Sequence, residues 1–234
     1  MTARPARDAR AAGWIAPRLH PFAQDVGSVV PPGFEDHARV FHPARRGDAA
    51  VPWREIARAN GRTVHREMQF GSIAGTWSRA SPDPSLWTAD PETGSLPLEI
   101  VRELVAVLRR HTGTPERCWI AVWEGFGDLD LPAGTPRFEH PGRAYYLLEG
   151  RVDDVTRPLF QHAWHYRSPN LWWPDDRAWC VATEIDLTYT YVAGTVECIE
   201  AVLAAPGIEA LRARLDDGIT IASDTLNPGP RPPR

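Results

Sequence analysis

The chain of 234 residues contains no lysine, so all 26 of its basic residues are arginine. A Schiff base with a carbonyl substrate or with pyridoxal phosphate needs a lysine amine, which excludes lysine-dependent aldolases and PLP enzymes. The phosphate-binding P-loop and the protein-kinase site also depend on a lysine. The sequence therefore predicts no PLP cofactor and no P-loop nucleotide chemistry, and it points to no other cofactor.

Cysteine and long apolar runs are also scarce. The three cysteines, Cys118, Cys180 and Cys198, form no C-x-x-C pair, and two of them lie inside apolar runs. We expect buried, reduced thiols rather than disulfides or nucleophiles. No run approaches the roughly 18 apolar residues of a membrane span, and the N-terminus lacks the apolar core of a secretory signal. We therefore expect a cytoplasmic protein without a membrane partner.

The net charge of −4 is unevenly distributed. Residues 1–66 carry eleven arginines and six acids, whereas residues 118–200 carry thirteen acids and six arginines. An acidic middle region repels phosphate backbones, which predicts that the chain does not bind nucleic acid. The basic N-terminal part is either a contact for an anionic partner or a solvated tail, and we favour the tail.

A hydrophobic fraction of 43% and ten tryptophans are enough for a sizeable core. We predict a disordered tail over residues 1–12, one domain over 13–226 and a second, proline-rich disordered tail over 227–234. Helices are expected over 51–61, 96–113 and 195–207, with Thr195 as the N-cap of the last.

Strands are expected within 31–48, over 118–125, over 143–150 and within 178–194. The segment 71–95 is expected to be a long loop that is anchored by Trp77 and Trp87. A short helix near 208–215 and a strand near 218–222 complete the prediction. Because the strands cluster and the helices intervene irregularly, we predict an α+β fold. Its sheet should be largely antiparallel or mixed, with about three helices packed on it.

Carboxylates follow two of the predicted strands. Alternation along 178–187 places Trp179 and Val181 on one face of the strand. The other face carries small residues, on which we expect a closely packed helix, and then Glu184 and Asp186. If this strand neighbours 118–124, the candidate ligands of a hard cation, or members of an acid/base pair, are Glu124, Asp128, Glu184 and Asp186. The alternative is a solvated sheet edge whose carboxylates pair with Arg177 or Arg143.

Two histidines three positions apart, His162 and His165, are the second candidate for a catalytic or metal site. On a helix the two imidazoles share one face, and a metal site would then need a third ligand. The candidate catalytic residues are Glu184, Asp186, His162 and His165. A loop or strand without a metal is the interpretation that we favour for this spacing.

The stretch from Pro169 to Arg177 is bounded by two prolines, which predicts a rigid loop that enters a strand. Adjacent tryptophans in an extended chain face opposite ways, so one ring can anchor the core while the other lines a surface. Such a surface would suit a protein partner or a flat ligand. Its candidate binding residues are Trp172, Trp173, Asp175, Asp176 and Arg177. The alternative is that both rings are buried, with Asp176 and Arg177 linking the loop to the sheet.

Three segments, HTGTPERCWIAVWEGFGD (111–128), RAYYLLEG (143–150) and SPNLWWPDDRAWCVATEIDLTYTYVAGT (168–195), carry a resemblance. Over roughly 30–226 the chain resembles an uncharacterised actinobacterial protein family with an SPNLWWP-DDRAW motif. The helix opening at Leu96-Pro97 and the acidic strands with interspersed tryptophan are more loosely similar to the SUKH (Smi1/Knr4-like) superfamily, many members of which are immunity proteins against toxins. The first resemblance implies a bacterial, cytosolic protein with a single domain, the second is an analogy, and neither carries over a functional residue.

Three functions follow from these patterns. The leading one is a non-enzymatic protein that binds a partner through the acidic, tryptophan-containing surface. The second is a metal-assisted hydrolase that uses the carboxylate cluster. The third is a small-molecule-binding domain whose pocket is lined by tryptophans.

Overall fold

The structure is a computed structural model, and it describes residues 3–76, 81–127, 129, 131–140, 142–158 and 166–230. Its strands are β1 (Arg4–Pro5), β2 (Asp36–Phe41), β3 (Ala44–Arg46), β4 (Ala49–Val51), β5 (Cys118–Trp123), β6 (Arg137–His140), β7 (Arg143–Gly150), β8 (Leu171–Pro174), β9 (Cys180–Ala182), β10 (Tyr189–Gly194) and β11 (Ala210–Ala213). Its α-helices are α1 (Trp53–Ala59), α2 (Phe70–Ala74), α3 (Leu98–Leu108) and α4 (Val196–Leu203). Its 3-10 helices are η1 (Arg10–Ala12), η2 (Ala16–Arg18), η3 (Val26–Ser28), η4 (Val152–Thr156) and η5 (Ile221–Ser223).

Nine strands form one sheet in the order β1-β7-β5-β8-β9-β10-β2-β11, with β6 also paired to β7. Every pair in it is antiparallel. The β3–β4 hairpin forms a separate two-stranded sheet. The predicted α+β class with a largely antiparallel sheet is therefore confirmed.

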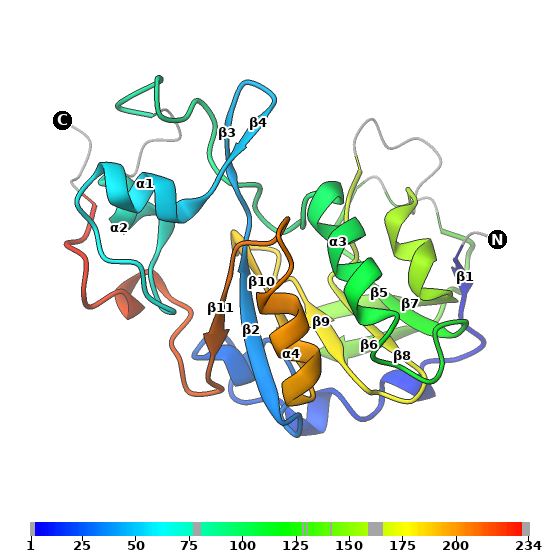
Figure 1. The fold of residues 1–234 in the computed structure, drawn as a ribbon. Coiled ribbons are helices and arrows are strands. Elements are labelled where there is room, and N and C mark those ends of the chain that lie inside the picture. The colour runs from blue at the N-terminus through cyan, green and yellow to red at the C-terminus, as the bar shows by residue number, and fades with distance from the viewer. Residues whose placement is uncertain are drawn as a thin grey trace.

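One face of the sheet is covered by α3 and α4, which lie in front of the strands in Figure 1. The helical spacing of Val101, Leu104, Val105 and Leu108 puts all four side chains in this core, as the sequence predicts. Thr195 caps α4, because its hydroxyl accepts the Cys198 N–H at 3.2 Å. The helices predicted over 96–113 and 195–207 are thus confirmed as α3 and α4, and the one predicted over 51–61 is confirmed as α1; each is shorter than expected.

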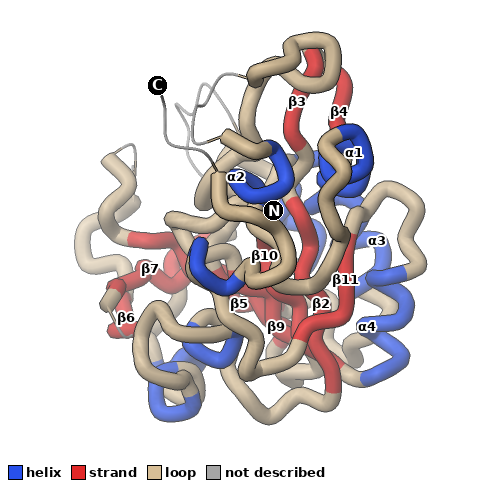
Figure 2. Tube along the Cα trace, turned by 90° about the vertical axis from the view of Figure 1, so that its left-hand side faces the viewer, coloured by secondary structure: helices blue, strands red, loops and turns tan. Residues whose placement is uncertain are grey.

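The other face is covered by irregular segments and short helices rather than by long helices. Figure 2 shows the strands between α3 and α4 on one side and loops with short helices on the other. The N-terminal segment supplies Ala12, Trp14 and Ile15 to this second core, and α1 supplies Trp53. Side chains that alternate along the strands therefore enter two separate cores, one under α3 and α4 and the other under loops, α1, α2 and short 3-10 helices.

Several predictions of local structure are wrong. Residues 3–12 are not a tail: Arg4–Pro5 pairs with β7, and Ala6 is buried. In the segment 227–234, Asn227 is buried and accepts the Thr63 N–H at 2.8 Å; residues 231–234 lie outside the described residues. The expected loop 71–95 begins with part of α2. Its Trp87 is buried as predicted, while Trp77 lies outside the described residues.

The order of the last two elements is also reversed. Strand β11 replaces the helix predicted near 208–215, and η5 replaces the strand predicted near 218–222. The small residues Cys180 and Ala182 face the irregular cover and not α3 or α4. Trp179 and Val181, in contrast, face α3 and α4.

The three cysteines are buried and free, as predicted. Burial raises the pKa of all three thiols, that of Cys198 to about 12. Within the part of the chain that the structure describes, no helix has the length and apolar character needed to cross a bilayer.

Candidate ligand-binding site

The tryptophan pair in β8 is not on a surface. Trp172 is 1% exposed and Trp173 is 0% exposed, and their rings enter opposite cores. Trp172 packs edge-on against Trp179 at 5.2 Å between ring centroids, and Trp173 packs edge-on against Trp14 at 6.0 Å. The prediction that one of the two rings lines a surface is wrong, because the N-terminal segment covers the second face.

The three polar residues after this pair are exposed, and they hold the loop in place. The Trp119 indole N–H donates to Asp175 Oδ1 at 2.9 Å. The Gly113 N–H donates to Asp176 Oδ2 at 2.7 Å. Arg177 adopts a left-handed backbone with a φ of 54°. The alternative interpretation, in which these residues link the loop to its neighbours, is the one that the contacts favour.

The carboxylates predicted as metal ligands are divided between two arginines. Glu124 lies 2.7 Å from Arg137. Glu184 and Asp186 lie 3.1 Å and 2.8 Å from Nη2 of Arg143. A cation that used both carboxylates would have to displace this guanidinium, so the geometry favours the alternative of carboxylates paired with Arg143.

Asp128, His162 and His165 lie outside the described residues, so their roles stay predictions. Among the residues that the structure does describe, no group of three or more His, Cys, Asp or Glu side chains is placed to hold a metal ion.

Glu184 and Asp186 instead line a cavity of about 360 Å³ beside Arg143. Segments far apart in the sequence meet there. They are the N-terminal segment, the start of α2, the β6–β7 hairpin, the β9–β10 connection and the start of η5. The apolar wall consists of Phe22, Val29, Leu187, Ile219 and Ile221. The polar side is formed by Ser28, Gln69, His140, Arg143, Glu184 and Asp186. Apolar walls with a few converging polar groups are the usual form of a small-molecule site.

Arg143 is fixed from all sides of its guanidinium. Its Nε donates to Glu184 Oε1 at 3.2 Å, and its Nη2 donates to Asp186 Oδ2 at 2.8 Å. Its Nη1 donates to the Gly142 carbonyl at 3.2 Å, and the guanidinium lies 5.1 Å from the centre of the Phe22 ring. The side chain is only 18% exposed. This guanidinium therefore has a single preorganised orientation in the cavity wall.

Glu184 is positioned by buried hydrogen bonds that run across the sheet. The hydroxyls of Thr183 and Thr190 lie 2.8 Å apart, and Thr190 Oγ1 lies 2.9 Å from His42 Nε2. On the other side, the Asn170 side-chain amide donates to the Thr183 carbonyl at 3.1 Å. This row of buried polar groups fixes the start of the β9–β10 connection, and therefore the position of Glu184, which follows Thr183.

Behind the cavity, His140 is 5% exposed and its ring packs edge-on against Tyr145 at 5.4 Å. Burial raises the pKa of Tyr145 well above its usual range, and the negative charge of Glu184 raises it further. Tyr145 is therefore a neutral phenol at any physiological pH.

The rim of the cavity exposes apolar side chains. Phe22 is 40% exposed and Ile221 is 48% exposed, which makes them two of the most exposed large apolar residues in the described chain. Next to Phe22, Ala23 has a φ of 61°, a left-handed conformation that costs a residue other than glycine about 1–2 kcal/mol. Backbone strain of this kind is found at ligand sites, where the surrounding structure maintains it.

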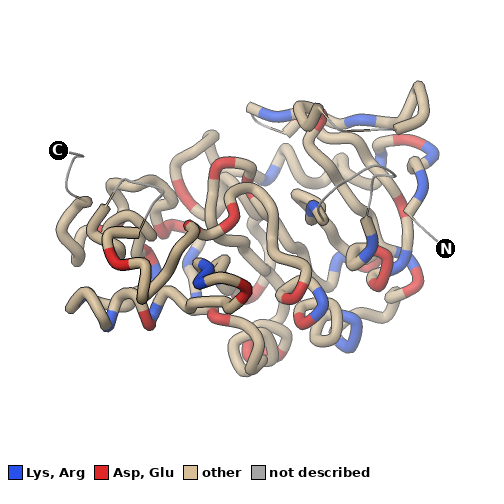
Figure 3. The backbone as a smooth tube through the Cα atoms, turned by 90° about the horizontal axis from the view of Figure 1, so that it is seen from above, with Lys and Arg blue, Asp and Glu red and all other residues tan. Residues whose placement is uncertain are grey.

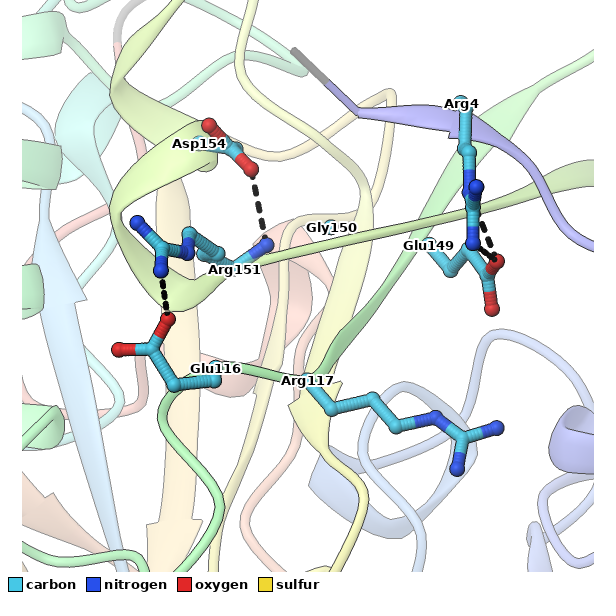
Figure 4. A pocket seen from close by; sticks show the side chains of 7 residues that line it. All are labelled: Arg4, Glu116, Arg117, Glu149, Gly150, Arg151 and Asp154. Carbon is cyan, nitrogen blue, oxygen red and sulfur yellow. Dashed lines mark hydrogen bonds and ion pairs between the residues drawn. The ribbon is translucent and has the colours of Figure 1, made fainter. Parts of the chain in front are cut away.

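A second cavity of about 340 Å³ lies at the N-terminal edge of the sheet and is shown in Figure 4. It is lined by Arg4, Glu116, Arg117, Glu149, Gly150, Arg151 and Asp154. Arg4 lies 2.8 Å from Glu149, Arg151 pairs with Glu116, and Arg117 turns away toward Asp175. Every described side chain in this lining is charged, so its apolar area comes only from the stems of arginine and glutamate and from backbone. A ligand with a polar group would have to compete with the existing ion pairs.

The surroundings of this second cavity are also mixed in charge. In Figure 3, basic and acidic positions lie next to one another around the N-terminal segment. Arg10, for example, lies 2.7 Å from Asp8. Four arginines of the N-terminal part, Arg4, Arg10, Arg45 and Arg66, are held in ion pairs. The cavity beside Arg143 is the better candidate for a site, because it combines charged groups with an apolar wall.

The sequence singled out two of the cavity's acids, Glu184 and Asp186, and its alternative interpretation named Arg177 or Arg143 as their partner. It missed Phe22, Gln69, His140 and Ile221 as members of the site. The sequence FEHPGR, which spans the turn between β6 and β7, was the only local signal for His140. The other three residues join the cavity through contacts between distant segments.

No family model matches the sequence, and no curated protein and no solved structure shows significant similarity to it. The resemblances to an actinobacterial family and to the SUKH superfamily therefore stay predictions, and the function is argued from the cavity alone.

Proposed function

We propose that this protein binds a small amphipathic molecule in the cavity beside Arg143, as a non-enzymatic binding protein. The observation that carries the proposal is the combination of an apolar wall with a fixed Glu184–Arg143–Asp186 group in one cavity. The apolar body of a ligand would displace water from Leu187, Ile219 and Ile221. The charged group would then select the polar part of the ligand and its orientation.

The binding role predicted from the sequence is kept, but its location changes. Trp172 and Trp173 are both buried in the core, so they cannot be the aromatic anchors of a protein-binding surface. Whether the chain also binds a protein partner stays a prediction. The hydrolase alternative is less favoured, because Arg143 already occupies the position between Glu184 and Asp186.

A blocking variant tests the proposal. Ile221 lines the cavity and is 48% exposed, so Ile221→Trp should fill the mouth of the cavity without disturbing the core. Leu226 is 62% exposed on the same segment but lies outside this cavity, which makes Leu226→Trp the matched control. The neutral probe is 2-phenylethanol, followed by ligand-observed NMR.

For a probe of this size we expect a Kd on the order of 1 mM. Ile221→Trp should weaken binding by about tenfold, which corresponds to about 1.4 kcal/mol. Leu226→Trp should leave it unchanged. The proposal is wrong if the probe does not bind saturably, or if both tryptophan variants bind it as the natural chain does.

A further inference from the structure

We infer that the ligand of the cavity beside Arg143 carries a positively charged amine. This inference rests on the proposed function and adds the chemical class of the ligand to it.

The guanidinium of Arg143 has no edge left for an anionic ligand. Its Nε and Nη2 donate to Glu184 and Asp186, at 3.2 Å and 2.8 Å, and its Nη1 donates to a backbone carbonyl. A ligand carboxylate would have to displace one of these carboxylates and would meet the other as a like charge. The guanidinium therefore organises the acids, and it is not itself the receptor for an anion.

Glu184 is also occupied on both oxygens. Its Oε1 accepts from Arg143, and its Oε2 accepts the Asp186 N–H at 2.6 Å. Its side chain is only 11% exposed. Glu184 therefore contributes negative charge and rigidity to the cavity, but it offers little contact area to a ligand.

Asp186 is the acid that remains open. Its Oδ2 accepts from Arg143, while its side chain is 74% exposed at the cavity. Two carboxylates against one guanidinium leave one net negative charge at this position. A donor with a positive charge is the complementary group, because it pairs with Asp186 without disturbing the Arg143–Glu184 contact.

The apolar wall fixes the rest of the ligand. An amine bound at Asp186 has Phe22 and Ile221 at the rim and Leu187 beside it. Aromatic rings attract cations as well as apolar groups, and Phe22 already lies 5.1 Å from the guanidinium of Arg143. The site is thus suited to an amine on an apolar or aromatic body.

Three probes of similar size separate the charge from the apolar body: 2-phenylethylamine, 2-phenylethanol and 3-phenylpropionate. The amine should bind about fivefold more tightly than the alcohol, which is the scale of one exposed ion pair, and the carboxylate more weakly than the alcohol. This preference should shrink as sodium chloride is raised, because the charge at Asp186 is exposed to solvent.

Asp186→Asn removes the charge and keeps the shape. It should reduce the affinity for the amine to that for the alcohol, while binding of the alcohol stays the same. Asp216→Asn is the matched control, since Asp216 is 71% exposed, is paired with an arginine at 3.0 Å and lies outside the cavity. It should leave all three affinities unchanged.

The outcomes distinguish this inference from the proposed function. If none of the probes binds saturably, or if Ile221→Trp does not weaken them, the cavity is not a ligand site and both proposals fail. If the probes bind and Ile221→Trp weakens them, the proposed function holds. The amine inference is then overturned if the carboxylate binds as well as the amine, or if Asp186→Asn keeps the preference for the amine.

Discussion

One face of the sheet is covered by α3 and α4, and the acids buried beside this core are Asp36 and Asp154, whereas the other face is covered by loops and short helices that also bury an arginine. Arg39 illustrates the second face: it is 1% exposed and its guanidinium lies 3.5 Å from the centre of the Tyr189 ring. Asp217 and Asp224 are buried on the same side. A cover made of loops and short helices is held together in part by such polar contacts, and the spaces left between its segments include the candidate site.

The largest effect on stability is expected from tryptophan substitutions that compare how tightly the irregular cover and the helical cover are packed. Trp172→Ala removes a ring from the helix-covered core, and Trp173→Ala removes one from the other core. Each should lower the free energy of unfolding by about 3–5 kcal/mol, because both rings are fully buried. Urea denaturation measures both. A cost below about 1 kcal/mol for Trp173→Ala alone would show that the N-terminal segment does not pack on the sheet.

The second prediction concerns Asp224, which fastens the C-terminal segment of the irregular cover. It accepts His65 Nε2 at 2.8 Å and the N–H groups of Gln69 and Asn227 at 3.0 Å and 2.9 Å. Asp224→Ala should lower the free energy of unfolding by about 3 kcal/mol, because these buried donors lose their acceptor. The matched change on the helical side, Thr195→Ala, removes one cap and should cost about 1 kcal/mol.

The same aspartate gives the irregular cover a sensitivity to acid. Burial raises the pKa of Asp224, but the hydrogen bonds from Asn227, Gln69 and His65 outweigh it and hold this pKa below its usual value. The stabilisation is therefore present above about pH 4, the unfolded pKa, and is lost as the pH falls through the lower folded pKa. If Asp224→Ala and the natural chain lost stability in parallel below pH 4, the assignment would be wrong.

A third prediction places a different pH response at His42, which lies in the row of polar groups that ends at the cavity. Burial lowers the pKa of His42 to about 4. Since the unfolded chain binds this proton near pH 6.5, stability should fall by about 2 kcal/mol between pH 7 and pH 5. Unfolding measured across this range should show a flatter profile for His42→Gln. An unchanged slope in that variant would mean that His42 is not the titrating group.

The smallest expected effect compares two alanines, one in each cover. Ala23 has a φ of 61° in the irregular cover, so Ala23→Gly relieves strain and should change the free energy of unfolding by less than about 1 kcal/mol in either direction. Ala201 lies within α4, where glycine should cost about 1 kcal/mol. Thermal unfolding of the two variants measures the difference between these two effects. An equal loss in both variants would remove the argument for strain at the rim of the cavity.

The contrast between the two covers also explains which elements the sequence could predict. Helices α3 and α4 carry their own periodicity and caps, so a local pattern was sufficient for both. Strand β11 reads as a helix because EALRARL is rich in good helix formers, yet its pairing with β2 overrides that propensity. The N-terminal segment reads as a tail because no local pattern reveals that Ala6 and Ala12 will be buried.

The candidate site was predictable to the same extent. Alternation singled out Glu184 and Asp186, and charge pairing suggested Arg143. The apolar half of the cavity was not predictable, because Phe22 and Ile221 are about 200 positions apart in the chain and meet only in the folded protein. The error at Trp173 has the same origin, since its cover comes from the N-terminal segment.

The most direct test of the central claim is a two-dimensional ¹H–¹⁵N NMR titration with 2-phenylethylamine. Our account predicts saturable shifts for backbone amides around Phe22, Arg143, Asp186 and Ile221, with no shifts around the charged cavity of Figure 4. Shifts centred on Arg4, Glu116 and Arg151, or no saturable shifts at all, would contradict it.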